Sequence, residues 1–184
     1  METPNIAIVS FARFGKDFLE QISSVVQHEF RCQVMVYELY LDLSEFFDAG
    51  RRQYNGDKLL RAFDKMEFPE SDKKIALLSV DLFIPILTYI FGQAQLGGRT
   101  GIASMYRLSN ERYGIDNGEK VLLERLTKEV IHELGHLFGL VHCHTPTCVM
   151  RSSTYVEDID QKETGLCSKC RSELKLDLIP VNEF

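Results

Sequence analysis

Residues 132–142 read HELGHLFGLVH and place two histidines four residues apart, with a glutamate directly after the first. On a helix, His132 and His136 share one face, so both imidazoles can reach a single metal ion. Glu133 is one residue along and can lie over the open side of that metal as a general base. The stretch therefore predicts a metal-binding helix. The alternative is ordinary core or surface histidines beside a solvated carboxylate.

The residues that follow predict a third ligand. Gly139 can end the helix in a left-handed turn, which glycine enters without a steric penalty, and the reversed chain would return His142 to the metal. Three neutral imidazoles leave zinc one open position for water, which is the arrangement of catalytic rather than structural sites. Zinc would acidify this water and polarise a peptide carbonyl, while Glu133 removes the proton.

Four of the five cysteines lie in the last quarter of the chain and form a second set of candidate ligands. Cys143 and Cys148 can combine with Cys167 and Cys170, because four thiolates make the closed tetrahedral set of structural zinc. Two disulfides are the alternative, which a reducing compartment disfavours. Cys143 directly follows the third histidine, so we hypothesise that folding of the four-cysteine site also fixes the direction of that histidine.

The spacing of apolar residues predicts the longer elements. A helix is expected at residues 119–137, where leucine and valine recur at intervals of three and four. Gly135 within it is either incidental or allows close approach of another segment. A strand, a helix and a strand at 5–10, 13–30 and 32–39 have the order of a parallel unit.

Turn signals and short apolar runs predict the remaining elements. These are a short helix at 57–66, a strand at 75–80, and an antiparallel edge hairpin of strands at 91–95 and 101–106 around Gly97 and Gly98. Residues 44–56 and 67–74 are expected to be polar loops, with Lys73 and Lys74 in solvent.

Together these elements predict an α+β fold, in which a mixed twisted sheet is backed by two long helices. We expect a single domain over residues 1–184, with an upper lobe at 1–139 that carries the active-site helix. Residues 140–184 would form a small C-terminal lobe, which has few large apolar residues and needs a metal cross-link to hold its shape. The cleft is expected between the lobes, with zinc at its floor.

The order His-Glu-x-x-His-x-x-Gly-x-x-His resembles the signature of the metzincin clan of zinc peptidases. With the Cys-x₄-Cys pair, the nearby Met150 and the later Cys-x₂-Cys pair, the block at residues 132–170 resembles the archaemetzincin family specifically. The resemblance implies a metzincin-like fold and a peptidase that acts on short peptides or N-termini, as an aminopeptidase does. It also implies two zinc ions per chain: a catalytic one above a Met-turn at Met150, and a structural one on the four cysteines.

Composition argues against several other classes. The 184-residue chain has 21 basic and 27 acidic residues, and its net charge of −6 argues against a nucleic-acid surface. Local basic residues at Lys162, Lys169, Arg171 and Lys175 leave nucleic-acid binding as a third possibility. No apolar run approaches the roughly 20 residues of a membrane helix, and the start METP lacks the features of a signal peptide. We therefore expect a soluble, cytoplasmic protein without a membrane or nucleic-acid partner.

Zinc-dependent hydrolysis of a peptide or protein substrate is the function that these observations favour. Glu133 favours an enzyme, since a structural zinc site needs no adjacent base. The alternative is a two-zinc module that binds peptides or proteins with little or no turnover. The expected fold starts by about Asn5 and the last ligand is Cys170, so we expect no inhibitory prosegment. We therefore hypothesise a restricted cleft, occluded by residues 44–56 or 67–74.

Overall fold

The structure is a computed structural model, and it describes residues 4–110 and 118–176. Its centre is a five-stranded sheet, whose strands are β1 (Ile6–Ser10), β2 (Val34–Glu38), β5 (Lys73–Leu78), β8 (Gly92–Ala94) and β9 (Thr100–Ser104). Their order across the sheet is β2-β1-β5-β9-β8. The first four strands are parallel, and β8 pairs antiparallel with β9 at one edge. The expected mixed sheet and its edge hairpin are therefore confirmed.

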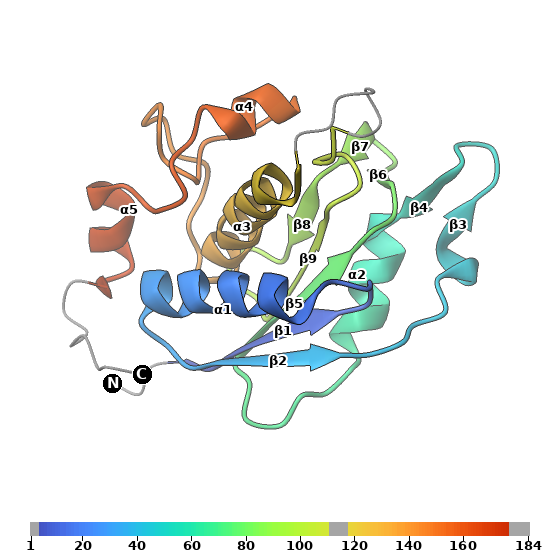
Figure 1. Cartoon of the computed structure of the whole chain (residues 1–184), viewed down its shortest axis with the longest axis horizontal. Coiled ribbons are helices and arrows are strands. Elements are labelled where there is room, and N and C mark those ends of the chain that lie inside the picture. Colours follow the sequence, from blue (N-terminus) through green and yellow to red (C-terminus); the bar gives the residue numbers. More distant parts are fainter. Residues whose placement is uncertain (1–3, 111–117, 177–184) are drawn as a thin grey trace.

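Helices cover both faces of this sheet. They are α1 (Lys16–Phe30), α2 (Gly56–Asp64) and α3 (Gly118–Leu137). The two long helices, α1 and α3, lie on one face, and α2 lies on the other (Figure 1). None of the described helices is both long and apolar enough to cross a membrane.

The strand β1 shows why the sheet is covered on both sides. All five of its residues are buried. Ile6 and Ile8 belong to the core beneath α1 and α3, while Ala7 and Val9 belong to the core beneath α2. A strand buried on both faces needs apolar residues at successive positions, and the run IAIV supplies them.

A second, smaller sheet is not predicted by the sequence. It follows a short 3₁₀ helix, η1 (Ser44–Phe46), and its strands are β3 (Phe47–Asp48), β4 (Gln53–Asn55), β6 (Leu82–Ile84) and β7 (Leu87–Ile90). Their order is β3-β4-β6-β7. The expectation of a polar loop at 44–56 is therefore wrong. Strands of two to four residues are too short to show an alternating pattern in the sequence.

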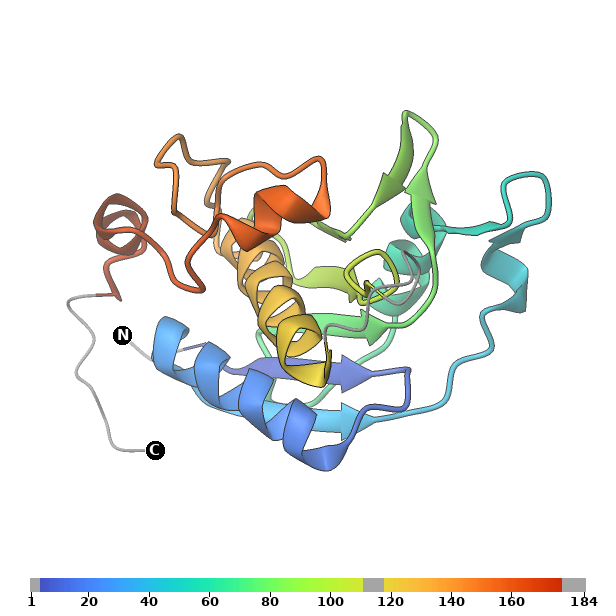
Figure 2. The same cartoon turned by 45° about the horizontal axis from the view of Figure 1, so that its top comes forward.

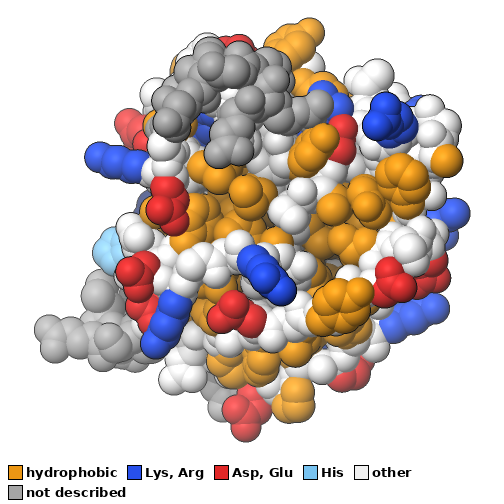
Figure 3. All heavy atoms as spheres, turned by 45° about the vertical axis from the view of Figure 1, so that its right-hand side comes forward, with side chains coloured by type: hydrophobic (Ala, Val, Ile, Leu, Met, Phe, Trp, Pro, Cys, Tyr) orange, Lys and Arg blue, Asp and Glu red, His pale blue; other side chains and the backbone are white. Residues whose placement is uncertain are grey.

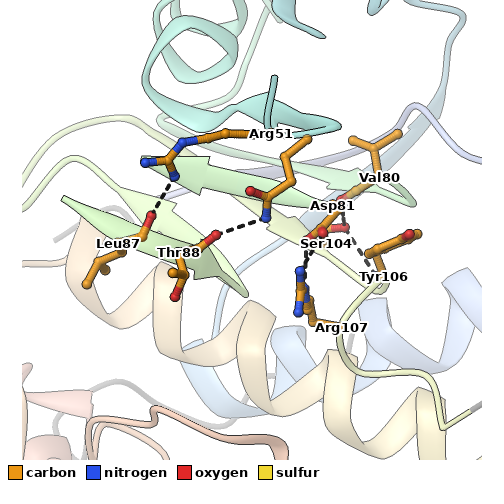
Figure 4. Close-up of polar contacts among 9 residues, drawn as sticks. Arg51, Val80, Asp81, Leu87, Thr88, Ser104, Tyr106 and Arg107 are labelled. Atoms are coloured by element: carbon orange, nitrogen blue, oxygen red, sulfur yellow. Dashed lines mark hydrogen bonds and ion pairs between the residues drawn. The ribbon is translucent and has the colours of Figure 1, made fainter. Parts of the chain in front are cut away.

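Side chains at the start of β4 and just before it reach across β6 to hold β7 (Figure 4). The Arg51 guanidinium lies over the Phe83 ring, 4.4 Å from its centroid, and donates to the Leu87 carbonyl at 3.1 Å. The Gln53 amide donates to the Thr88 carbonyl at 2.9 Å. These contacts hold β7 in place within the small sheet.

The small sheet also carries exposed apolar residues. Hydrophobic side chains gather in several clusters on the face of the molecule drawn in Figure 3. Phe47, Ile86 and Leu87 are among the exposed large hydrophobic residues, and Ile86 between β6 and β7 is 86% exposed. The tip of this hairpin is therefore apolar where it meets solvent.

The expectation that Lys73 and Lys74 are solvated in a loop is wrong, because both belong to β5. Lys74 is buried, and its ammonium donates to the carbonyl of Asp64 at 2.8 Å and to that of Met66. The Lys73 ammonium donates to the Leu137 carbonyl at 3.0 Å. Each ammonium therefore satisfies carbonyls at the C-terminal end of a helix, where positive charge is favoured.

The C-terminal part packs beside α3 and contains two short helices, α4 (Val156–Asp160) and α5 (Ser168–Glu173) (Figure 2). Glu29 of α1 ties this part to the rest of the fold. Its buried carboxylate accepts from the Leu166 backbone at 3.0 Å and from the Arg171 guanidinium at 2.7 Å. Arg171 is therefore a partly buried partner of Glu29 rather than a fully exposed basic residue.

We expect Lys74→Met to lower the free energy of unfolding by about 2 kcal/mol, because two carbonyls at the end of α2 lose a charged donor. Urea denaturation followed by circular dichroism measures this. Lys58→Met is the matched control, since Lys58 is exposed on α2 and its substitution should cost less than about 0.5 kcal/mol. Equal midpoints for the two variants would contradict the buried role.

Candidate active site

Two histidines of α3 face each other with their ring nitrogens fixed by backbone carbonyls. His132 Nδ1 lies 2.8 Å from the Val149 carbonyl, and His136 Nδ1 lies 2.7 Å from the Leu140 carbonyl. Carbonyls only accept, so each Nδ1 carries the proton and each Nε2 presents a lone pair. The two Nε2 atoms are 3.1 Å apart. Two facing lone pairs repel each other unless a cation lies between them.

The chemistry of this pair fits zinc. A tetrahedral ion with Zn–N bonds of about 2.0–2.1 Å would hold two ligand nitrogens about 3.3 Å apart, close to the observed separation. Carbonyl partners at Nδ1 are also the usual second contact of metal-binding histidines. Burial, with Lys162 and the neighbouring His136 as further causes, lowers the pKa of His132 to about 3. The neutral imidazole that metal binding requires is therefore the stable form.

The end of α3 brings a third histidine to this pair. Gly139 has φ +97°. Its N–H donates to the His136 carbonyl at 2.9 Å, and the Leu140 N–H donates to the Gly135 carbonyl at 2.9 Å. These two bonds form a Schellman turn, as the sequence predicts for a glycine here. After the turn, the His142 ring centroid lies 5.0 Å from that of His136.

The three histidines offer one metal-ligating nitrogen each, and these atoms all lie within 4.8 Å of one another. His132 is buried, His136 is partly buried and His142 is exposed. The group is therefore closed on the side of the helix and open on the side of the returning chain.

A tight turn at Met150 supports the helix from below. The Arg151 N–H donates to the Cys148 carbonyl at 3.0 Å, and the Met150 side chain between them is fully buried. A Cβ added to Gly135 would overlap the Met150 sulfur and lie 3.0 Å from its methyl carbon. Gly135 is therefore not incidental, because its missing side chain lets the thioether pack against the backbone of α3.

The four cysteines of the C-terminal part form the second ligand group, with their sulfurs within 4.8 Å of one another. The Cys143 and Cys167 sulfurs are 3.8 Å apart, and so are those of Cys148 and Cys170. All four are free thiols rather than the alternative pair of disulfides. Tetrahedral zinc with Zn–S bonds of about 2.3 Å would place its sulfurs about 3.8 Å apart, so this group also fits zinc.

A cavity of about 450 Å³ opens over the three histidines. Its walls are residues 87–94 on one side and 152–154 on the other. The Tyr89 hydroxyl donates to the Thr154 carbonyl at 2.7 Å and so joins the two walls. Neither 44–56 nor 67–74 contributes to the lining, so the expectation that one of these segments occludes the cleft is wrong. The strand β7 of the small sheet lines the cleft instead.

Glu133 lies in the floor of this cavity and is 4% exposed. Burial, together with the neighbouring Glu129, raises the pKa of Glu133 well above its ordinary value. Gly92 of the edge strand β8 makes room for it, because a Cβ at that position would lie 2.8 Å from the Glu133 carboxylate. The carboxyl group is thus held between α3 and the edge of the main sheet.

Sequence reasoning missed four residues that shape this cavity: Gly92, Tyr89, Glu129 and Lys162. Glu129 carried a usable signal, since it precedes Glu133 by four residues and so lies on the same helix face. Lys162 was counted only as part of a basic group, but it is buried in the lining. The sequence gives no sign of this, because Lys162 reaches the cavity only through the tertiary fold.

Comparisons with known proteins decide the family. The model of peptidase family M54 matches residues 11–176. The chain is also 39% identical over 143 residues to an archaemetzincin from Pyrococcus horikoshii, covering 75% of this chain and 76% of the relative. The chain belongs to the archaemetzincin family. The resemblance predicted from the ligand spacing is therefore confirmed.

Solved structures of archaemetzincin relatives share the fold. An archaemetzincin from Methanopyrus kandleri superposes with a TM-score of 0.82 at 30% identity, covering 95% of both chains. A zinc-dependent peptidase from Methanocorpusculum labreanum gives a TM-score of 0.83 at 28% identity, covering 92% of this chain and 99% of the other. Membership of the archaemetzincin family makes the chain a zinc metallopeptidase, a hydrolase of peptide bonds.

We expect Gly135→Ala to destabilise the protein by about 1–3 kcal/mol through overpacking against Met150, although alanine favours a helix interior by about 1 kcal/mol. Thermal unfolding of a double-mutant cycle measures this. In a Met150→Ala background the same change should become neutral or stabilising, because the overlap is gone. Destabilisation of equal size in both backgrounds would show that the thioether contact is not the cause.

Proposed function

We propose that His132, His136 and His142 hold a zinc ion at which peptide bonds are cleaved, with Glu133 as the general base. The single observation that carries this proposal is the pair of Nε2 lone pairs 3.1 Å apart at the floor of a cavity. A zinc ion there would polarise a peptide carbonyl and acidify a water molecule. The open side of the histidine group is the side from which a substrate can enter.

Glu133 supplies the proton transfers in this proposal. Its carboxylate would take a proton from the attacking water and return it to the nitrogen of the departing amine. Burial supports this role, because a carboxylate with a raised pKa is a stronger base than a solvated one. Gly92 leaves the space in which that carboxylate can lie beside the edge strand.

A second zinc ion on the four cysteines is also part of the proposal, as a structural ion that gives a count of two per chain. The Cys143 N–H donates to the Met150 carbonyl at 2.9 Å, and Cys143 directly follows His142. Ordering of the cysteine group would therefore order the third histidine and the turn beneath the helix together. We also propose a single domain with lobes at 1–139 and 140–184, because the link through Cys143 joins the cysteine group of the second lobe to the helix of the first. Four free thiols are compatible with the cytoplasm, which we propose as the location.

We further propose that the enzyme is narrow in specificity, acting on short peptides or on N-termini as an aminopeptidase does. The Tyr89–Thr154 hydrogen bond supports narrow specificity, because it joins the two walls of the cavity. A long or folded substrate would have to break this bridge, whereas a short peptide could enter beside it.

Metal counting tests the two ligand groups. We expect two zinc ions in the wild-type protein by native mass spectrometry, one in His132→Ala, one in Cys167→Ser and none in the double variant. His144→Ala is the control, since His144 is exposed and belongs to neither group. In Cys167→Ser the affinity of the histidine site should also fall. Unchanged affinity there would disprove the coupling between the two groups.

Hydrolysis of a mixed peptide library, read by mass spectrometry, tests the activity. We expect Glu133→Gln to lower turnover by about 100-fold or more with its zinc content unchanged, because the proton acceptor is lost. Glu119→Gln is the matched control, since Glu119 is exposed on the same helix. The positions of the cuts would separate aminopeptidase from endopeptidase action. No cleavage by the fully loaded wild-type protein would contradict the proposal and favour a peptide-binding module.

A further inference from the structure

The cavity lining contains a buried group of three charged side chains on two different segments. Among the described residues that line it, Lys162 is the only lysine or arginine, and Glu129 and Glu133 are the only acidic residues. Each of the three is 4–5% exposed. Lysine and glutamate are almost never buried this deeply unless their charges are balanced, so the group requires an explanation.

Lys162 is fixed next to the histidine group through a shared acceptor. Its ammonium donates to the Val149 carbonyl at 3.1 Å, and His132 Nδ1 binds the same oxygen at 2.8 Å. A carbonyl oxygen has two lone pairs, so it can accept both bonds at once. The Lys162 ammonium therefore holds the atom that sets the tautomer and the direction of the His132 ring.

The two carboxyl groups form the other side of this arrangement. Glu129 and Glu133 are four residues apart on α3, so both carboxyl groups lie on the same face of the helix and line the same cavity. Such neighbours repel when both are ionised, and Lys162 is the cation in the lining that attracts both. The nearby Asp158 also attracts the Lys162 charge, while its carboxylate accepts from the Thr154 and Tyr155 N–H groups at 2.8 Å each.

Among the described residues, Lys162 forms no ion pair within 4 Å. Its charge therefore acts across the cavity floor rather than through a tight salt bridge. The arrangement at Lys162 differs from that at Lys74, whose ammonium donates only to carbonyls at the end of one helix. Lys162 contacts the turn that orients His132 and lines the same cavity as Glu129 and Glu133.

We propose that Lys162 is a positioning residue of the peptidase centre, which orients His132 through the Val149 carbonyl and, from the same cavity lining, offsets the negative charge of Glu129 and Glu133. The inference rests on the proposed function, because it assigns Lys162 to the same ligands and base. It makes Lys162 and Glu129 a functional pair, so that loss of one charge is partly corrected by loss of the other.

Lys162→Met tests the proposal, since methionine keeps the aliphatic stem and removes the ammonium. We expect kcat to fall about 10- to 100-fold, as for other partners of metal ligands, while KM changes less than about threefold. In Lys162→Met, the zinc ion of the histidine site (the ion that is missing in His132→Ala) should also pass to a competing chelator at a lower chelator concentration than in the wild-type protein. Lys58→Met, distant from the cavity, should leave both values unchanged.

Two further variants separate positioning from a purely structural role. Lys162→Arg keeps the charge and should retain more kcat than Lys162→Met. Glu129→Gln added to Lys162→Met should raise kcat above that of the single variant, because no unbalanced carboxylate remains. If Lys162→Met does not fold, the double variant Lys162→Gln/Glu129→Gln replaces it. Wild-type kcat together with wild-type zinc affinity in this double variant would overturn the proposal.

The chelator titration needs no turnover, so it separates this proposal from the proposed function. An inactive wild-type protein whose zinc affinity falls in Lys162→Met would reject the peptidase assignment and retain the link from Lys162 to His132. An active wild-type protein with unchanged kcat and zinc affinity in Lys162→Met would overturn the positioning role alone.

Discussion

Two backbone carbonyls, those of Val149 and Leu140, determine which nitrogen of each facing histidine is free to bind metal. Both carbonyls come from chain that follows α3, so the helix cannot orient its own histidines. The Schellman turn at Gly139 delivers the Leu140 carbonyl within one turn of the helix end. The Val149 carbonyl arrives later, in the turn that carries Met150. Much of the C-terminal architecture follows from the need to keep these acceptors in place.

The main sheet contributes the opposite side of the site. Its edge strand β8 approaches Glu133 closely at Gly92, and the preceding strand β7 lies along the wall of the cavity. Arg51 and Gln53 hold β7 in place, so that residues outside the cavity lining help to shape its wall. This wall of the cleft is thus formed by strands at the sheet edge.

The parts of the molecule that could be predicted from sequence are those whose geometry is local. The spacing of His132 and His136 specifies a shared helix face, and Gly139 specifies a turn, because both depend only on nearby backbone. The strands β1 and β5 could also be predicted, because each is a continuous buried run of mainly apolar residues. Lys162 and the strands of the small sheet could not be predicted, since a buried lysine looks like a solvated one in sequence. Strands of a few residues acquire their pairing only from the folded chain.

Glu29 binds Leu166 and Arg171, which lie 137 and 142 positions after it in the chain. A ribosome releases α1 long before it releases these partners. The acceptor for them is therefore in place first, and the cysteine group beside Leu166 can assemble only when nearly all of the described chain has emerged. Because the third histidine adjoins that group, a nascent chain carries the helix motif without its completed surroundings. The order of synthesis thus gives the histidine group its cysteine neighbours only at a late stage, after the main sheet and α3 have been made.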